Sequence, residues 1–173
     1  MKKVVALILS AVMLLSVTAF ADTALRIAAN PSISGGIVVL QVTVDGKAVD
    51  NSTVTVAPEA SELVKELTAA IDEAGMTGAF GSILENADEY KLLALQDIDI
   101  SNANEDLVVD LAVPGVVADN EVVTLLGLVE NGNVEWANLE VVSVEDGVLS
   151  VALTAELVEA AQSVDTVIAI LVK

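Results

Sequence analysis

The densest group of possible metal ligands in this sequence lies between Asp97 and Asp106. Carboxylate and amide oxygens crowded into one loop are the donors that Ca²⁺ prefers. The candidate ligands are Asp97, Asp99, Asn102, Asn104 and Asp106. The stretch lacks the glycine and the final glutamate of an EF-hand loop, and Ile98 and Ile100 give its first half the alternation of a strand. We therefore weigh a weak Ca²⁺ site, the one cofactor the sequence suggests, against a solvated strand end.

The chain lacks most of the side chains that nucleophilic catalysis requires. The chain has no histidine and no cysteine, which removes Ser-His-Asp and Cys-His arrangements and the usual zinc ligand sets. Ser61 and Lys65 are four residues apart on a predicted helix. Lys65 is flanked by Glu62 and Glu66, however, so nothing there would keep its amine neutral as a base requires.

Carboxylates are plentiful, so a carboxylate-based hydrolase of glycans is an alternative by residue type. Sugar rings usually stack on aromatic side chains, and these are scarce. Beyond residue 21 they are Phe80, Tyr90 and Trp136. Trp136 shares a predicted strand face with Val134, so we expect its indole to pack in the core rather than against a ligand.

The N-terminus has the three parts of an export signal. Met1-Lys2-Lys3 is a short positive region, and an apolar run follows from Val4 to Phe20. Ala19-Phe20-Ala21 supplies the small residues that signal peptidase requires. We expect residues 1–21 to be a cleaved signal peptide and the mature protein to be secreted or surface-associated. An uncleaved membrane anchor is the alternative, since about 17 apolar residues nearly span a bilayer.

Charge limits the class of partner. Without residues 1–21 the chain keeps 26 acidic residues against five basic ones, a formal charge of −21. Such a surface repels nucleic acid and anionic lipid headgroups, so we expect neither as a partner. A need for solubility alone accounts for this charge. Binding of a cation or of a basic partner is the more specific interpretation. With no cysteine, the protein must be held by its core.

Short β-type runs separated by glycine turns dominate the chain after residue 35. The predicted strands are 37–44, 48–56, 92–100, 107–113, 121–130, 134–144, 148–153 and 164–172. The last is apolar on both faces, which is typical of a central strand covered on two sides. One helix is predicted from Pro58 to a C-cap at Gly75, and another over 155–162. This spacing favours a sandwich or small barrel, with residues 22–90 as a hairpin plus helix, separate or in the same domain, and 91–173 as a β-sandwich.

A second line of evidence for the sandwich is the order of motifs after residue 90. The motifs are Asp110 to Val116, Val122 to Leu128, Asn131-Gly132 with Glu135-Trp136, Asp146-Gly147-Val148 with Val151, and Val167 to Ile170. In this order they resemble the small immunoglobulin-like β-sandwich modules of secreted and surface proteins of Gram-positive bacteria. The resemblance implies a mainly β fold with no active site to transfer. The helix-like stretch 155–162 departs from that family, which usually has a shorter loop there.

Taken together, these features predict a non-enzymatic, extracellular bacterial module that works through protein contacts or as a structural or adhesion domain. We expect its contact surfaces at exposed sheet edges or in the 76–89 loop. The alternative is a carboxylate-based hydrolase or a calcium-dependent binding domain acting on cell-wall or extracellular glycans. In each case the partner is an extracellular protein or a cell-wall component.

Overall fold

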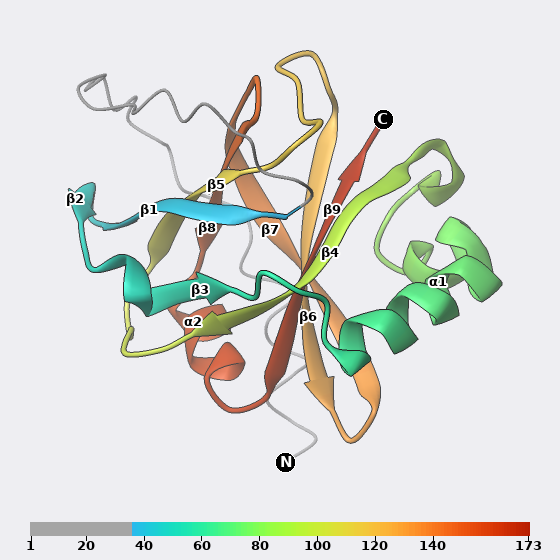
Figure 1. The fold of residues 1–173 in the computed structure, drawn as a ribbon, viewed down its shortest axis with the longest axis horizontal. Helices are drawn as coiled ribbons and strands as arrows, with labels where there is room; N and C mark the ends of the chain where they lie inside the picture. The colour runs from blue at the N-terminus through green and yellow to red at the C-terminus, as the bar shows by residue number, and fades with distance from the viewer. Residues whose placement is uncertain (1–35) are drawn as a thin grey trace. The chain divides into compact units, whose positions relative to one another are not determined.

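The computed structural model describes residues 36–173. The predicted signal peptide at residues 1–21 lies outside the described residues. In the described part, nine strands form one continuous antiparallel sheet in the order β2-β1-β5-β8-β7-β6-β9-β4-β3, accompanied by two α-helices (Figure 1). The prediction of a mainly β fold with one or two helices is confirmed. The finer prediction, an immunoglobulin-like sandwich, stays a prediction.

The strands are β1 (Val38–Val44), β2 (Lys47–Ala48), β3 (Val54–Val56), β4 (Lys91–Ile100), β5 (Leu107–Ala112), β6 (Val122–Glu130), β7 (Asn133–Glu145), β8 (Val148–Leu153) and β9 (Asp165–Val172). The helices are α1 (Glu62–Phe80) and α2 (Ala155–Ala161), with short 3-10 turns η2 (Asn51–Thr53) and η3 (Ala87–Glu89). Two-residue turns at Asp45-Gly46, Asn131-Gly132 and Asp146-Gly147 join β1 to β2, β6 to β7 and β7 to β8. Asn131 and Gly132 both have positive φ, 53° and 77°, which matches the twist of the flanking strands β6 and β7.

The sheet curls because β7 is shared between its two halves. Residues 133–139 of β7 pair with β6, and residues 140–145 pair with β8, with a register shift between Val141 and Ser143. We call β2-β1-β5-β8 with the end of β7 the first half, and the start of β7 with β6-β9-β4-β3 the second half. Gln96 of β4 joins the halves, since its Oε1 accepts from the Ile37 N–H at 2.5 Å and its Nε2 donates to the Ala57 carbonyl at 3.0 Å.

The inner face of the curl holds the core. On the first half, alternate residues of each strand are buried: Val42, Leu107, Val109, Leu111, Leu149, Val151 and Leu153. On the second half, β9 lies between β6 and β4 and is buried from Thr166 to Leu171. The prediction of a central strand covered on both faces is confirmed. Ala169 and Leu171 pack with Ile71 and Phe80 of α1, while Ile168 and Ile170, which alternate to the other face, are also fully buried.

Helix α1 covers the outer face of the second half. It begins at Glu62, with Ser61 as N-cap accepting from the Val64 N–H at 3.1 Å, rather than at Pro58. Gly75 interrupts it with φ 71° and ψ 168°, so the predicted end there is right for the first segment, and a second segment continues to Phe80. The Phe80 and Trp136 rings meet edge to face, with centroids 5.3 Å apart. Trp136 was predicted to pack in the core, and it packs against this cluster while remaining partly buried.

The predicted strand 48–56 was wrong as a single element. Only Lys47–Ala48 returns along β1, and Val54–Val56 pairs instead with β4. Side chains replace the missing ladder: the Asn51 amide accepts from the Val42 N–H at 3.2 Å and donates to the Leu40 carbonyl at 3.0 Å. A polar side chain that binds backbone groups competes with strand pairing in this way.

Candidate functional site

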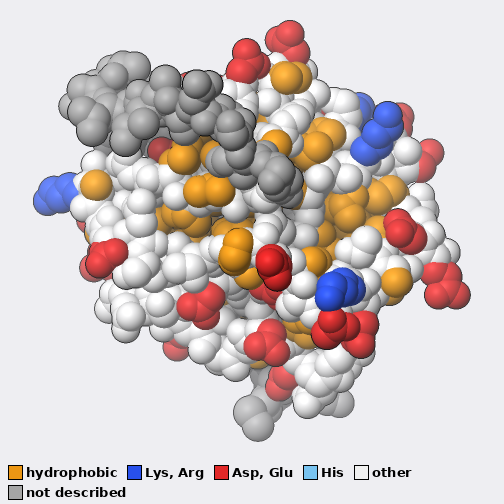
Figure 2. Space-filling model, viewed as in Figure 1, with side chains coloured by type: hydrophobic (Ala, Val, Ile, Leu, Met, Phe, Trp, Pro, Cys, Tyr) orange, Lys and Arg blue, Asp and Glu red, His pale blue; other side chains and the backbone are white. Residues whose placement is uncertain are grey.

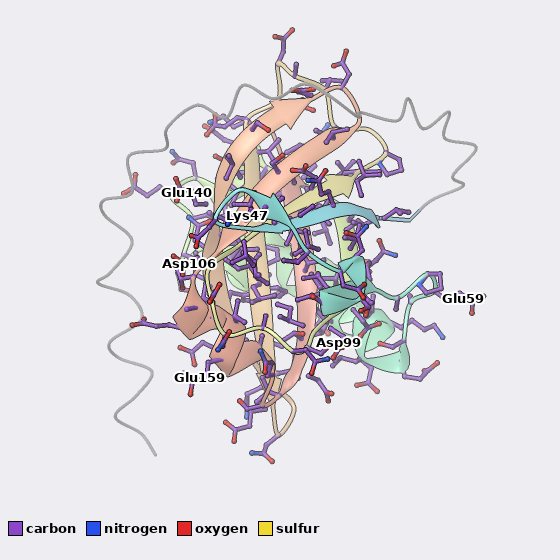
Figure 3. The ribbon with its side chains drawn as sticks, turned by 90° about the vertical axis from the view of Figure 1, so that its left-hand side faces the viewer. Lys47, Glu59, Asp99, Asp106, Glu140 and Glu159 are labelled. Carbon is purple, nitrogen blue, oxygen red and sulfur yellow. The ribbon has the colours of Figure 1, made fainter. Side chains whose placement is uncertain are left out.

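The predicted Ca²⁺ ligands are spread along β4 and the loop that follows it. Asp97 and Asp99 lie on β4, while Asn102, Asn104 and Asp106 lie in the loop before β5. The Asp106 carboxylate accepts from the Ala155 N–H at 2.7 Å, at the start of α2. Asp99 and Asp106 project at separate places in Figure 3. Among residues 36–173 no three acidic side chains come together to hold a metal, so the Ca²⁺ site remains a prediction from residue types.

Asp97 and Asp99 instead line a groove with a volume of about 550 Å³. It lies between β3, the start of α1, β4 and the start of β9, and also contains Asp165, which sequence reasoning missed. We call it the acidic groove. Asp97 is engaged there, since its two carboxylate oxygens accept from the Ser61 hydroxyl at 2.8 Å and the Ser61 N–H at 3.2 Å. This carboxylate therefore holds the N-terminus of α1 against β4.

A cluster with shifted pKa values lies where β4, β6 and β9 meet. The Tyr90 hydroxyl donates to Glu121 Oε1 at 2.5 Å, and the Lys173 ammonium lies 2.8 Å from Glu89 and 3.3 Å from Glu121. The hydrogen bonds to Glu89 and then Glu121 raise the pKa of Lys173 to about 12. The hydrogen bond from Tyr90, followed by that from Lys173, lowers the pKa of Glu121, and donation to Glu121 raises the pKa of Tyr90.

These shifts favour the ordinary charge state of each group at neutral pH. A general base or nucleophile needs the opposite, a pKa moved toward the working pH. The cluster also includes backbone bonds in both directions between Glu121 and Lys173, of 3.0 and 3.3 Å. We therefore interpret it as a clamp that joins the ends of three strands.

The outer face of the first half presents a different surface, which we call the open face. Cross-strand register arranges it in three rows: Val38, Ala112, Val148 and Glu145; Gln41, Asp110, Ser150 and Ser143; Thr43, Val108, Ala152 and Glu140. Neither described helix packs on it, since α1 packs on the second half and α2 contacts β4 (Figure 1). The two outer rows are mainly apolar on β1, β5 and β8, and Glu140 and Glu145 lie at the β7 end. Ala112 and Ser150 are buried, and the other members of the three rows are partly or fully exposed.

Asp110 lies in the middle of the open face. Its neighbours Val109 and Leu111 are fully buried on the inner side, so alternation directs Asp110 outward. Its carboxylate accepts from the Ser150 hydroxyl at 2.5 Å. None of the ion pairs within residues 36–173 includes it.

Exposed apolar side chains gather at the β1 margin of this face. Val38 is 39% exposed, Leu40 37% and Val49 36%. A bulge between Val39 and Gln41 places Leu40 beside the residue opposite Asp110. Figure 2 shows hydrophobic side chains gathered around the position of β1. The margin is therefore apolar where β1 begins.

Sequence reasoning placed the contact surfaces at sheet edges and in the 76–89 loop, and did not find the open face. The available signal was the alternation of Leu107, Val109 and Leu111, which already put Val108 and Asp110 on the opposite side. The sequence does not show the strand register that brings the four strands of this face together.

Within the described residues 36–173, no helix combines the length and the apolarity needed to cross a bilayer. No protein-family model, curated protein or solved structure matches the chain.

Proposed function

We propose that this protein is a non-enzymatic module that is exported, acts at or beyond the cell surface, and works by binding another protein through the open face. The observation that carries the proposal is the unequal covering of the sheet. Helix α1 buries the outer face of the second half, whereas on the first half neither described helix covers partly exposed apolar residues such as Val108, Val148 and Ala152. A sheet face with apolar side chains generally packs against another layer, and a partner can supply that layer.

The roles of the polar side chains support binding rather than chemistry. Asp97 holds the start of α1 through Ser61, and Glu121 is bound by Tyr90 and Lys173. Each of these carboxylates joins elements that are distant in the sequence. In this proposal the carboxylates organise the scaffold, and the open face acts on the partner.

Export in this proposal comes from the signal peptide predicted at residues 1–21. Residues 91–173 would be an immunoglobulin-like module of the kind found on bacterial surfaces. The glycan-directed alternative, hydrolytic or calcium-dependent, would act in the acidic groove, where Asp97, Asp99 and Asp165 line one hollow.

The test is capture of a partner from extracellular and cell-wall extracts on the immobilised full-length chain, compared between matched variants. Ala152→Lys places a charge on the open face, and Ala69→Lys places the same charge on the exposed side of α1. We expect Ala152→Lys to lose the captured protein and Ala69→Lys to retain it, with both variants melting like the wild type. The proposal is wrong if Ala152→Lys still captures the partner.

The groove is tested in the same assay with Asp99→Asn, at an exposed carboxylate. Loss of capture with Asp99→Asn, together with retention by Ala152→Lys, would assign binding to the acidic groove instead. Release of soluble sugar from wall glycan by the purified chain, abolished in Asp99→Asn, would replace the proposal with the hydrolase alternative.

A further inference from the structure

We infer that the partner of the open face is a basic amphipathic segment that presents an arginine or lysine, set within an apolar surface, opposite Asp110. This inference rests on the proposed function, since it names the partner of the same face. It follows from three features: the central position of Asp110, its small number of donors, and the charge of the molecule.

The position of Asp110 means that a partner cannot avoid it. The residue lies in the central row of the face, between the apolar pairs Ala112–Val148 and Val108–Ala152 in the rows on either side. A partner that covers both pairs also covers Asp110. Binding that buries the apolar rows therefore removes water from this carboxylate.

The carboxylate then needs a new partner. An ionised carboxylate accepts several hydrogen bonds, and within the described residues Asp110 receives one, from Ser150. A buried charge without compensation strongly opposes binding, whereas a cation at hydrogen-bond distance compensates it. A guanidinium suits the site best, because its planar donors can bind both oxygens of one carboxylate.

A second copy of this chain would not supply the cation. Residues 36–173 contain 25 of the 26 acidic residues against four lysines, and none of these lysines is in the three rows. Two open faces placed together would bring the Asp110 and Glu140 carboxylates of both copies into one interface. Like charges across an interface oppose association, whereas a basic partner is electrostatically complementary.

The second half of the sheet indicates what kind of element fits. There an amphipathic helix, α1, places Ile71 and Phe80 against the outer face of β6 and β9. A helix from a partner, with an apolar stripe and basic flanks, would cover the first half in the same two-layer manner.

The test uses a synthetic helical peptide of about 18 residues built from leucine, alanine and lysine, with one arginine in the centre of its apolar stripe. A second peptide has glutamine in place of that arginine. Each is titrated into the ¹⁵N-labelled full-length chain while amide shifts are recorded. We expect shifts centred on β5 and β8, and at least about tenfold weaker binding for the glutamine peptide.

Variants of the protein separate a specific contact from general acidity. Asp110→Asn should weaken the arginine peptide by the same factor and change binding of the glutamine peptide little. Glu159→Gln removes an equal charge at an exposed position of α2, away from the open face and the acidic groove, and should leave both affinities unchanged. Equal losses from the two variants, or shifts centred outside β5 and β8, would overturn the inference.

The remaining outcomes distinguish this inference from the proposal beneath it. If Ala152→Lys abolishes capture of the natural partner and Asp110→Asn does not, the open face is the contact surface and the paired cation is rejected. If neither variant affects capture, the proposed function fails. Self-association by sedimentation that Ala152→Lys abolishes would assign the face to a second copy and also reject the inference.

Discussion

Substituting Gly127 by alanine tests the packing that divides the sheet into a covered and an open half. Gly127 lies in β6, opposite Trp136 on one side and Val167 on the other. A Cβ atom at this position would lie 2.7 Å from Trp136 Cζ3 and 2.7 Å from Val167 Cγ2. Carbon atoms pack at about 3.5–4.0 Å, so both side chains would have to move by roughly 1 Å.

Both neighbours are held by packing. Val167 is fully buried, and Trp136 packs against Phe80 of α1. Gly→Ala within a strand ordinarily stabilises by about 0.5–1 kcal/mol. Overpacking costs about 1–3 kcal/mol, and two simultaneous clashes place this substitution near the upper limit. We therefore expect a net loss of roughly 2 kcal/mol, or a fall in Tm of about 4–8 °C for a chain of this size.

The assay is thermal and urea unfolding followed by fluorescence, since Trp136 is the only tryptophan in the chain. We expect the Tm to fall and the native emission to shift to the red as the indole is displaced from α1. Gly36→Ala is the matched control, because the nearest atom to an added Cβ there is Gln96 Nε2 at 3.4 Å. Its stability should change by less than about 0.5 kcal/mol.

An unchanged or higher Tm for Gly127→Ala, with unshifted emission, would refute the reasoning. Trp136 would then not lie between β6 and α1. The second half of the sheet would lack the covering described above, and the contrast with the open face would disappear.

Three further predictions concern stability. Gly75→Ala should destabilise by about 1–3 kcal/mol in urea unfolding, because φ 71° with ψ 168° is open essentially only to glycine; a gain of about 1 kcal/mol, as in an ordinary helix interior, would mean that α1 is continuous there. Thr124→Val should raise stability by about 1 kcal/mol in thermal unfolding, since the buried Thr124 Oγ1 has no hydrogen-bond partner among the described residues; a loss would reveal a partner. The Glu121–Lys173 clamp should make the Tm depend on pH in two ranges, one acidic and one alkaline. Because the pKa of Glu121 is lowered, its contribution is present above about pH 4.5 and is lost as the pH falls through the folded value. Because the pKa of Lys173 is raised to about 12, its contribution is complete below about pH 10.5 and is lost as the pH rises through 12. Lys173→Met should reduce the change in Tm with pH in both ranges, and an unchanged dependence of Tm on pH would contradict the clamp.

Local signals in the sequence determined most of the elements of this protein. The Asn131-Gly132 hairpin forms because both residues accept positive φ, a property of the residues themselves. The alternation of Leu107, Val109 and Leu111 determined which face of β5 is buried, since side chains on a strand alternate. Gly75 was also predicted to end a helix, and it does interrupt α1.

Contacts between residues far apart in the chain decided the rest. Asp97 was a predicted metal ligand, but Ser61, 36 residues away, occupies both of its oxygens. The 48–56 segment had the composition of one strand, yet the Asn51 side chain ends its pairing with β1 and the chain crosses to β4. Asp110 became the centre of a surface only when register placed it beside Ser150. Propensity and alternation act over a few residues, whereas the pairing of strands depends on the free energy of the whole core, which no single segment contains.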